Sequence, residues 1–121
     1  MIRIAEEVRS ALDEGRGVVA LETTLVAHGF PAPDGVQVGL ASEAAVRAAG
    51  AIPATVGVLD GHVKVGLTEA ELARFTPDAR KAGPRDLAAC AARRALTTRC
   101  TSSCAIHSGR RCWATQSRCS S

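Results

Sequence analysis

The hydrophobic pattern near the N-terminus has the period of a helix. Its apolar positions lie one, three and four residues apart and are separated by charged residues: Ile4, Ala5, Val8 and Leu12. Gly15 and Gly17 then end this predicted helix. Val18–Leu21 follows as a short continuous apolar run. Such a run is typical of a strand covered on both faces, so the pattern predicts the start of an α/β sheet.

A loop and a second helix are predicted next. Residues 23–33 contain two threonines, His28-Gly29 and two prolines, Pro31 and Pro33, which together favour a loop. Long loops in compact domains are often functional. Asp34 can cap a helix that runs to about Ala49, and Gly50 is well placed to end it.

A hairpin and a short helix complete the regular pattern. Thr55–Leu59 is a second apolar strand, and Asp60-Gly61 makes a two-residue turn into His62–Val65. Asp-Gly between two β-branched runs is a strong signal for a β-hairpin. Residues 68–71, Thr-Glu-Ala-Glu, form a capping box that predicts the start of a short helix.

Composition changes abruptly after residue 88, which divides the chain into segments 1–88 and 89–121. The first segment has all 12 acidic residues and nine Lys and Arg, whereas the second has six Arg, all five Cys and no acid. The net charge of +3 therefore averages an acidic body and a basic tail. A basic tail is typical of a nucleic-acid-binding arm, although an unusual composition can have another origin.

The sequence also predicts the cellular setting. No apolar run approaches the ~18 residues that a membrane span needs. The N-terminus has early acids and no apolar stretch of the kind found in signal peptides. The segment 1–88 has no cysteine, as is common in proteins that work without disulfides or structural zinc. We therefore predict a cytoplasmic protein that does not contact a membrane.

Glu22 is the first candidate for chemistry because it follows the apolar run Val18–Leu21. Ligands of open α/β sheets bind outside the carboxyl ends of the strands. A carboxylate there can be partly desolvated, which raises its pKa and suits it to general acid–base catalysis. From position alone, a Glu that only caps the following segment is the favoured interpretation. His28, six residues on, can bind substrate or hold the loop, and a lone histidine is more often structural.

A basic loop is the second candidate. Pro77 and Gly83 frame Arg80 and Lys81, and a helix is predicted to begin near Arg85. Cations beside a helix start favour phosphate. An ordinary solvated loop is the more common origin of such a pattern.

Three stretches of the first segment resemble a known family. They are VVALETTLVAHGFPAPDGVQVG, then GAIPATVGVLDGHVKVGLTEAEL, and then Lys81 followed by Arg85-Asp86-Leu87. In this order they look like the N-terminal third of pseudouridine-5′-phosphate glycosidase, a family also called indigoidine synthase A-like or pseudouridylate synthase. The resemblance covers about residues 5–88. It implies an α/β fold, the N-terminal fragment of an α/β/α enzyme.

The resemblance also implies an activity. Such enzymes reversibly cleave the C–C glycosidic bond of pseudouridine 5′-phosphate to uracil and ribose 5-phosphate. A lysine holds ribose C1 as a Schiff base, a glutamate moves the proton at uracil C5, and Mn²⁺ assists. By this resemblance Glu22 is the proton donor and acceptor, and Lys81 binds substrate. The family also implies a homo-oligomer. Other C- or N-ribosyl phosphates stay open as substrates.

The resemblance weakens after Ala89. In the family, a glycine-rich loop, a metal-binding Asp and the Schiff-base Lys come later, whereas Lys81 is the last lysine of this chain. Pieces such as Ala95–Thr98 and Ala105–Arg110 still look family-like. The tail otherwise interleaves Arg, Cys, Ser and Thr, as shifted reading frames of a GC-rich gene do. We therefore predict a truncated, inactive copy that lacks the metal ligands and has an aberrant, disordered tail.

Two other interpretations of the tail stay open. Zinc ligation would use the residues Cys100, Cys104, His107 and Cys112, but their spacing lacks the Cys-x₂-Cys unit of structural zinc sites. An arm with Trp113 and scattered arginines would contact nucleic-acid phosphates, although it matches no recognised module. A non-enzymatic fragment or basic interaction module is thus the alternative to a glycosidase, and nucleic acid is the disfavoured partner.

Overall fold

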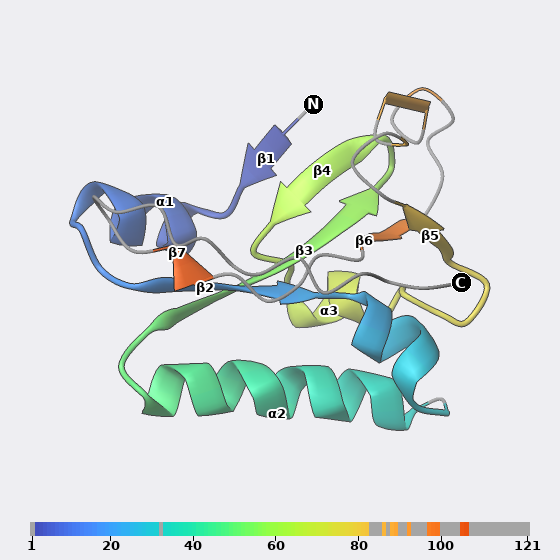
Figure 1. Cartoon of the computed structure of the whole chain (residues 1–121), viewed down its shortest axis with the longest axis horizontal. Helices are drawn as coiled ribbons and strands as arrows, with labels where there is room; N and C mark the ends of the chain where they lie inside the picture. The colour runs from blue at the N-terminus through green and yellow to red at the C-terminus, as the bar shows by residue number, and fades with distance from the viewer. Residues whose placement is uncertain are drawn as a thin grey trace.

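A computed structural model describes residues 2–31, 33–82, 86, 88–89, 92, 97–99 and 105–106. The described strands form one mixed sheet with helices on both faces (Figure 1). This arrangement confirms the predicted α/β class. The elements in chain order are β1 (Ile2–Ile4), α1 (Glu6–Asp13), β2 (Val18–Glu22), the π-helix η1 (Leu25–Gly29), α2 (Asp34–Ala48), β3 (Ile52–Leu59), β4 (His62–Val65), α3 (Glu69–Leu72), β5 (Arg80–Ala82), β6 (Thr97–Arg99) and β7 (Ala105–Ile106).

β3 is the centre of the sheet, whose main order is β1-β4-β3-β2-β7. β2 pairs with β3 in parallel, from Val18 opposite Ile52 to Glu22 opposite Val56. β4 pairs antiparallel on the other edge of β3. Every residue of β3 after Ile52 is buried, as expected for a strand with neighbours on both edges and cover on both faces.

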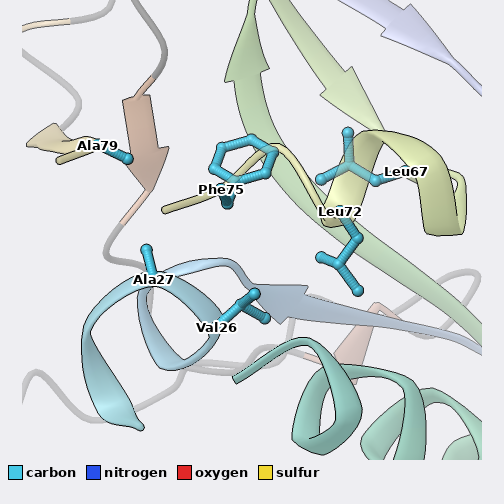
Figure 2. Packing of buried hydrophobic residues seen from close by; sticks show 6 residues of the cluster. All are labelled: Val26, Ala27, Leu67, Leu72, Phe75 and Ala79. Carbon is cyan, nitrogen blue, oxygen red and sulfur yellow. The ribbon is translucent and has the colours of Figure 1, made fainter. Parts of the chain in front are cut away.

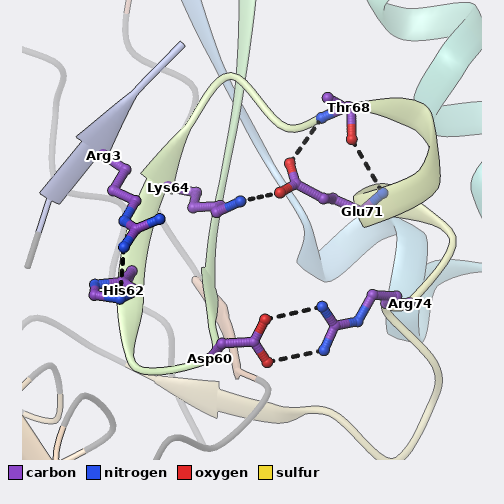
Figure 3. A network of polar contacts seen from close by, with 7 residues as sticks. All are labelled: Arg3, Asp60, His62, Lys64, Thr68, Glu71 and Arg74. Atoms are coloured by element: carbon purple, nitrogen blue, oxygen red, sulfur yellow. Dashed lines mark hydrogen bonds and ion pairs between the residues drawn. The ribbon is translucent and has the colours of Figure 1, made fainter.

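Two predicted local motifs are confirmed. In the β3–β4 turn, Asp60 and Gly61 have φ of 52° and 80°, the left-handed pair that a two-residue hairpin turn needs. At the start of α3, the Glu71 backbone N–H donates to the Thr68 hydroxyl, and the Thr68 N–H donates to the Glu71 carboxylate. Figure 3 shows this capping box beside an ion pair from Lys64 to Glu71. The ion pair therefore connects α3 to strand β4 of the hairpin through their side chains.

Helices cover the two faces of the sheet separately. On one face α1 packs Val8 and Ala11 against Val18 and Ala54. The opposite face has a larger cluster (Figure 2) of residues from η1, α3 and the segments that flank α3: Val26, Ala27, Leu67, Leu72, Phe75 and Ala79. Residues Val36 and Leu40 of α2 pack against this cluster.

Three predictions of local structure are corrected. Ile4 belongs to β1, which pairs with β4, so the first helix begins only at Glu6. The loop predicted for residues 23–33 contains the π-helix η1, and the basic loop contains β5. Pairing explains β1 and β5, because both are three-residue strands whose hydrogen-bond partners are distant in sequence.

The tail enters the sheet at two places. β6 pairs with β3 and β5, and β7 pairs antiparallel with β2. These five residues are in strands, so the predicted disorder does not apply to them. It stays a prediction for the rest of the tail, most of which lies outside the described residues. Within the described part of the chain, no helix combines the length and apolar character that crossing a membrane requires.

Candidate functional site

Glu22 is the last residue of β2, at the carboxyl end that the sequence predicts. Its side chain is half-buried, and it lines a pocket of about 210 Å³ between β2, η1 and α2. The other lining residues are mostly apolar: Leu21, Leu25, Val26, Gly39, Ser42 and Thr55. An apolar hollow with a few polar groups is the usual character of a small-molecule site. The position therefore suits a carboxylate that exchanges a proton with a bound ligand.

The polar groups around this pocket make contacts within the protein. The buried Thr55 hydroxyl donates to the Glu43 carboxylate, which links β3 to α2. The Ser42 hydroxyl donates to the Val38 carbonyl oxygen at 2.8 Å. These hydrogen bonds satisfy the two hydroxyl groups within the protein, as is usual for buried polar groups. The bond from Thr55 also fixes α2 to β3 beside the pocket. Glu22 is the pocket's carboxylate and hence its candidate proton carrier.

Thr23 fixes the chain directly after Glu22. Its side chain is completely buried, and its hydroxyl donates to the Val56 carbonyl oxygen at 3.1 Å. Its own carbonyl accepts from the Ala27 N–H at 3.1 Å, at the beginning of η1. π-helical turns are rare and occur frequently at functional sites. The strand end with Glu22 is therefore attached to both β3 and η1.

Lys81 lies near the same end of β2. It pairs with Thr98 of β6, which pairs with Gly57 of β3. Since β4 occupies one edge of β3, β6 must use the edge that β2 leaves after Glu22. The backbone of Lys81 is then two strands away from the backbone of Gly57. Neighbouring strands lie roughly 4.8 Å apart, so this distance is about 10 Å. The sheet thus brings Glu22 and Lys81 to one region, although they are far apart in sequence.

Side-chain alternation defines the faces. Lys81 shares the face of Gly57, where an added Cβ would lie 2.5 Å from the Phe75 ring, and this is the face covered by η1 and α2. Leu21 and Thr55 line the pocket on that face. Because side chains alternate along a strand, the Glu22 side chain is on the opposite face of β2 from that of Leu21. Glu22 lines the pocket from the end of the strand, where β2 is followed by η1. A ligand that contacts both Glu22 and Lys81 must lie across this end of the sheet.

The remaining candidates are less well placed. His28 is exposed in η1. Arg80 is exposed next to Lys81, and alternation directs these two side chains to opposite faces. Arg85 lies outside the described residues. The three-cation phosphate site therefore stays a prediction, of which the structure describes Lys81 and Arg80 on opposite faces of β5.

No metal site is found within residues 2–31, 33–82 and the short described pieces beyond them. There, no three side chains of His, Cys, Asp or Glu are close enough to share an ion. The described residues do not fit the Mn²⁺ that the resemblance implies, so no chemistry is assigned to a metal. The tail residues considered as zinc ligands, Cys100, Cys104, His107 and Cys112, lie outside the described residues, as does Trp113.

Sequence reasoning missed Thr23 and the Thr55–Glu43 pair. Threonine is common after strands, so nothing in the sequence identifies Thr23 as buried. The close packing of α2 on η1, in contrast, is indicated by the sequence. Gly35 and Gly39 are four residues apart, on one face of a predicted helix, and two glycines on one face allow another segment to pack closely. In the structure both glycines are buried, and an added Cβ at either would meet Val26.

A mixed sheet with a carboxylate at the carboxyl end of an inner strand is typical of α/β enzymes that bind small molecules. The family model for indigoidine synthase A-like protein matches residues 7–116. The chain belongs to this family. The match extends past residue 88, into the part of the tail that keeps family-like pieces.

Curated relatives agree with this assignment. The pseudouridine-5′-phosphate glycosidase of Chloroflexus aurantiacus is 51% identical over 92 residues, which is 74% of this chain and 30% of that protein. The Salinispora tropica protein of the same name is 46% identical over 119 residues, which is 94% of this chain and 37% of that protein. The chain thus spans about a third of the length of the curated relatives it matches.

Solved structures share the fold. The prealnumycin C-glycosynthase AlnA, crystallised with ribulose 5-phosphate, superposes with a TM-score of 0.71 at 34% identity, covering 83% of this chain and 32% of that one. An indigoidine synthase A-like protein from Thermotoga maritima gives a TM-score of 0.69 at 27% identity, with 82% and 32% covered. Both likenesses support the described arrangement of strands and helices.

Proposed function

We propose that this chain forms the N-terminal part of a pseudouridine-5′-phosphate glycosidase site, with Glu22 as the proton donor and acceptor. The observation that carries the proposal is the half-buried Glu22 carboxylate at the carboxyl end of β2, lining an apolar pocket. The Salinispora tropica relative that carries this name is 46% identical to the chain, and its match covers 94% of the chain and therefore includes Glu22.

The proposed chemistry explains why a carboxylate is needed there. When the C–C bond between ribose C1 and uracil C5 breaks, uracil C5 keeps the electron pair and must gain a proton. A carboxylic acid beside the departing carbon supplies that proton and takes it back in the reverse reaction. A lysine amine that has displaced the ring oxygen from ribose C1 donates its nitrogen lone pair to C1 as the C–C bond breaks, so C1 is left as an iminium.

Lys81 has a separate role in the proposal. Its exposed ammonium lies at the same end of the sheet as Glu22 and is suited to the substrate phosphate. The iminium-forming lysine of the family comes later in sequence, and this chain has no lysine after Lys81. We therefore expect the 121-residue polypeptide alone to be inactive. Its partners would be the small-molecule substrate and further copies of the complete enzyme in the cytoplasm.

The test is an exchange of segments. Residues 1–88 replace the matching segment of the Chloroflexus aurantiacus relative, and uracil release from pseudouridine 5′-phosphate is followed with Mn²⁺ present. We expect turnover by this fusion enzyme and none by the 121-residue chain. A fusion with the circular dichroism of the intact relative but without activity would refute the proposal. Turnover by the chain alone near the enzymatic median of ~10 s⁻¹ would refute the need for a later lysine.

A second substrate class has support of its own. AlnA is described as a C-glycosynthase in complex with ribulose 5-phosphate, and it shares this fold at 34% identity. Another C-ribosyl phosphate is therefore the alternative substrate. Ribulose 5-phosphate is tested as an inhibitor of uracil release by the fusion enzyme: inhibition at concentrations below that of pseudouridine 5′-phosphate would support the alternative, and no inhibition would remove its support.

A further inference from the structure

We propose that Thr23 is a positioning residue for Glu22: its hydroxyl fixes the end of β2 to β3 beside the acid–base carboxylate. This inference rests on the proposed function, because that function gives Glu22 its role. Thr23 has no exposed surface, so its side chain cannot contact a ligand directly. Any effect on catalysis must act through the backbone that it holds.

The hydrogen bond crosses the sheet where Glu22 sits. Glu22 pairs with Val56 in the parallel ladder, and the Thr23 hydroxyl donates to the carbonyl of that same Val56 at 3.1 Å. The β2–β3 ladder ends at Glu22. The side chain of Thr23 therefore extends the attachment by one residue beyond the last ladder pair, and it limits fraying at the catalytic position.

The backbone of Thr23 holds the chain from the other side. Its carbonyl accepts from the Ala27 N–H, so the turn into η1 starts directly after the strand. α2 packs closely against this turn, because an added Cβ at Gly35 would lie 3.0 Å from the Val26 carbonyl carbon. The path of the chain on both sides of Thr23 is thus fixed by packing and hydrogen bonds.

Such restraint matters for a general acid. The carboxyl must lie within hydrogen-bond reach of the carbon that it protonates. Displacement of a reacting group by about 1 Å can lower the rate about 10²-fold. Loss of the Thr23 hydroxyl should therefore lower kcat more than it raises KM, because substrate binding depends on other contacts.

The first measurement uses the full 121-residue chain and amide hydrogen exchange. Thr23→Val is nearly isosteric but cannot donate, whereas Thr23→Ser keeps the hydroxyl. We expect faster exchange at residues 22–29 in Thr23→Val, unchanged exchange in α1, and wild-type exchange in Thr23→Ser. Thr76→Val, the same change at an exposed position, is the matched control. Unchanged exchange at residues 22–29 in Thr23→Val would overturn the proposal.

The second measurement uses the fusion enzyme. We expect Thr23→Val to lower kcat about 10- to 100-fold with KM within about twofold, and Thr23→Ser to restore most of the rate. If wild-type fusion is active and Glu22→Gln is not, but Thr23→Val has normal kcat, only the positioning role fails. If Thr23→Ser is as slow as Thr23→Val, the hydroxyl is not the cause. An inactive wild-type fusion with correct folding means that the proposed function fails, and the role of Thr23 in it as well.

Discussion

Replacing Gly35 by alanine should destabilise this chain, although alanine normally stabilises a helix. Gly35 is the second residue of α2, in its first turn, so Gly→Ala gains from propensity at most the roughly 1 kcal/mol of a helix interior. Here an added Cβ would lie 3.0 Å from the Val26 carbonyl carbon and 3.4 Å from its Cα, and it would lie closer still to the carbonyl oxygen. The obstacle is backbone, which cannot rotate away as a side chain can.

The magnitude follows from this geometry. Carbon atoms pack best at about 3.5–4.0 Å, so α2 and η1 must separate by at least about 0.5 Å. Overpacking in a core costs about 1–3 kcal/mol, and a backbone obstacle favours the upper end. Subtracting the helix-propensity gain leaves a loss of about 2 kcal/mol in the free energy of unfolding.

Urea unfolding followed by far-ultraviolet circular dichroism measures this loss. With a slope of about 2 kcal/mol per molar urea, the midpoint should fall by about 1 M. Gly17→Ala is the control, since its added Cβ would lie 3.9 Å from the Ala51 Cβ, an ordinary contact. That variant should be neutral or slightly stabilised, by up to about 1 kcal/mol. A higher midpoint for Gly35→Ala would refute the close packing of α2 on η1.

Two further predictions concern charged groups. The hydrogen bond from Arg47 lowers the pKa of Glu7, so the α1–α2 ion pair stabilises the fold above pH 4.5, and this contribution is lost as the pH falls through the lowered pKa. Because both side chains are about half exposed, Glu7→Gln should reduce the free energy of unfolding by only about 0.5 kcal/mol at pH 7, with a difference that shrinks in acid urea titrations. Lys81→Met in the fusion enzyme should raise KM for the substrate about tenfold or more with a smaller change in kcat, since a hydrogen bond to a charged group is worth about 1.5–3 kcal/mol. An unchanged KM would remove Lys81 from the substrate site.

Sequence predicted those parts of the fold whose signals are local. The hairpin turn at Asp60-Gly61 needs left-handed backbone that few residue pairs adopt readily. The capping box at Thr68 is likewise complete within four residues. The strand that ends at Glu22 was predictable because an apolar run without alternation indicates burial on both faces.

Elements that depend on distant partners could not be predicted in this way. β1 and β5 are strands because of β4 and β6, and neither has enough residues to show a strand period. The proximity of Lys81 to Glu22 depends on β6, which lies far along the chain from both. The hydrogen bond behind the proposed role of Thr23 goes to a carbonyl 33 residues away, so only the folded chain shows it.

The most direct test of the proposed function is the turnover of the fusion enzyme with Glu22→Gln. The amide is nearly isosteric with the carboxyl group but cannot transfer the proton. Loss of a general acid–base group lowers the rate about 10²–10⁴-fold, and we predict a fall of that size in kcat with substrate binding largely kept. Glu6→Gln, at an exposed position in the first turn of α1, is the matched control and should keep the wild-type rate. If Glu22→Gln retains most of the rate while Glu6→Gln behaves as wild type, Glu22 is not the proton carrier.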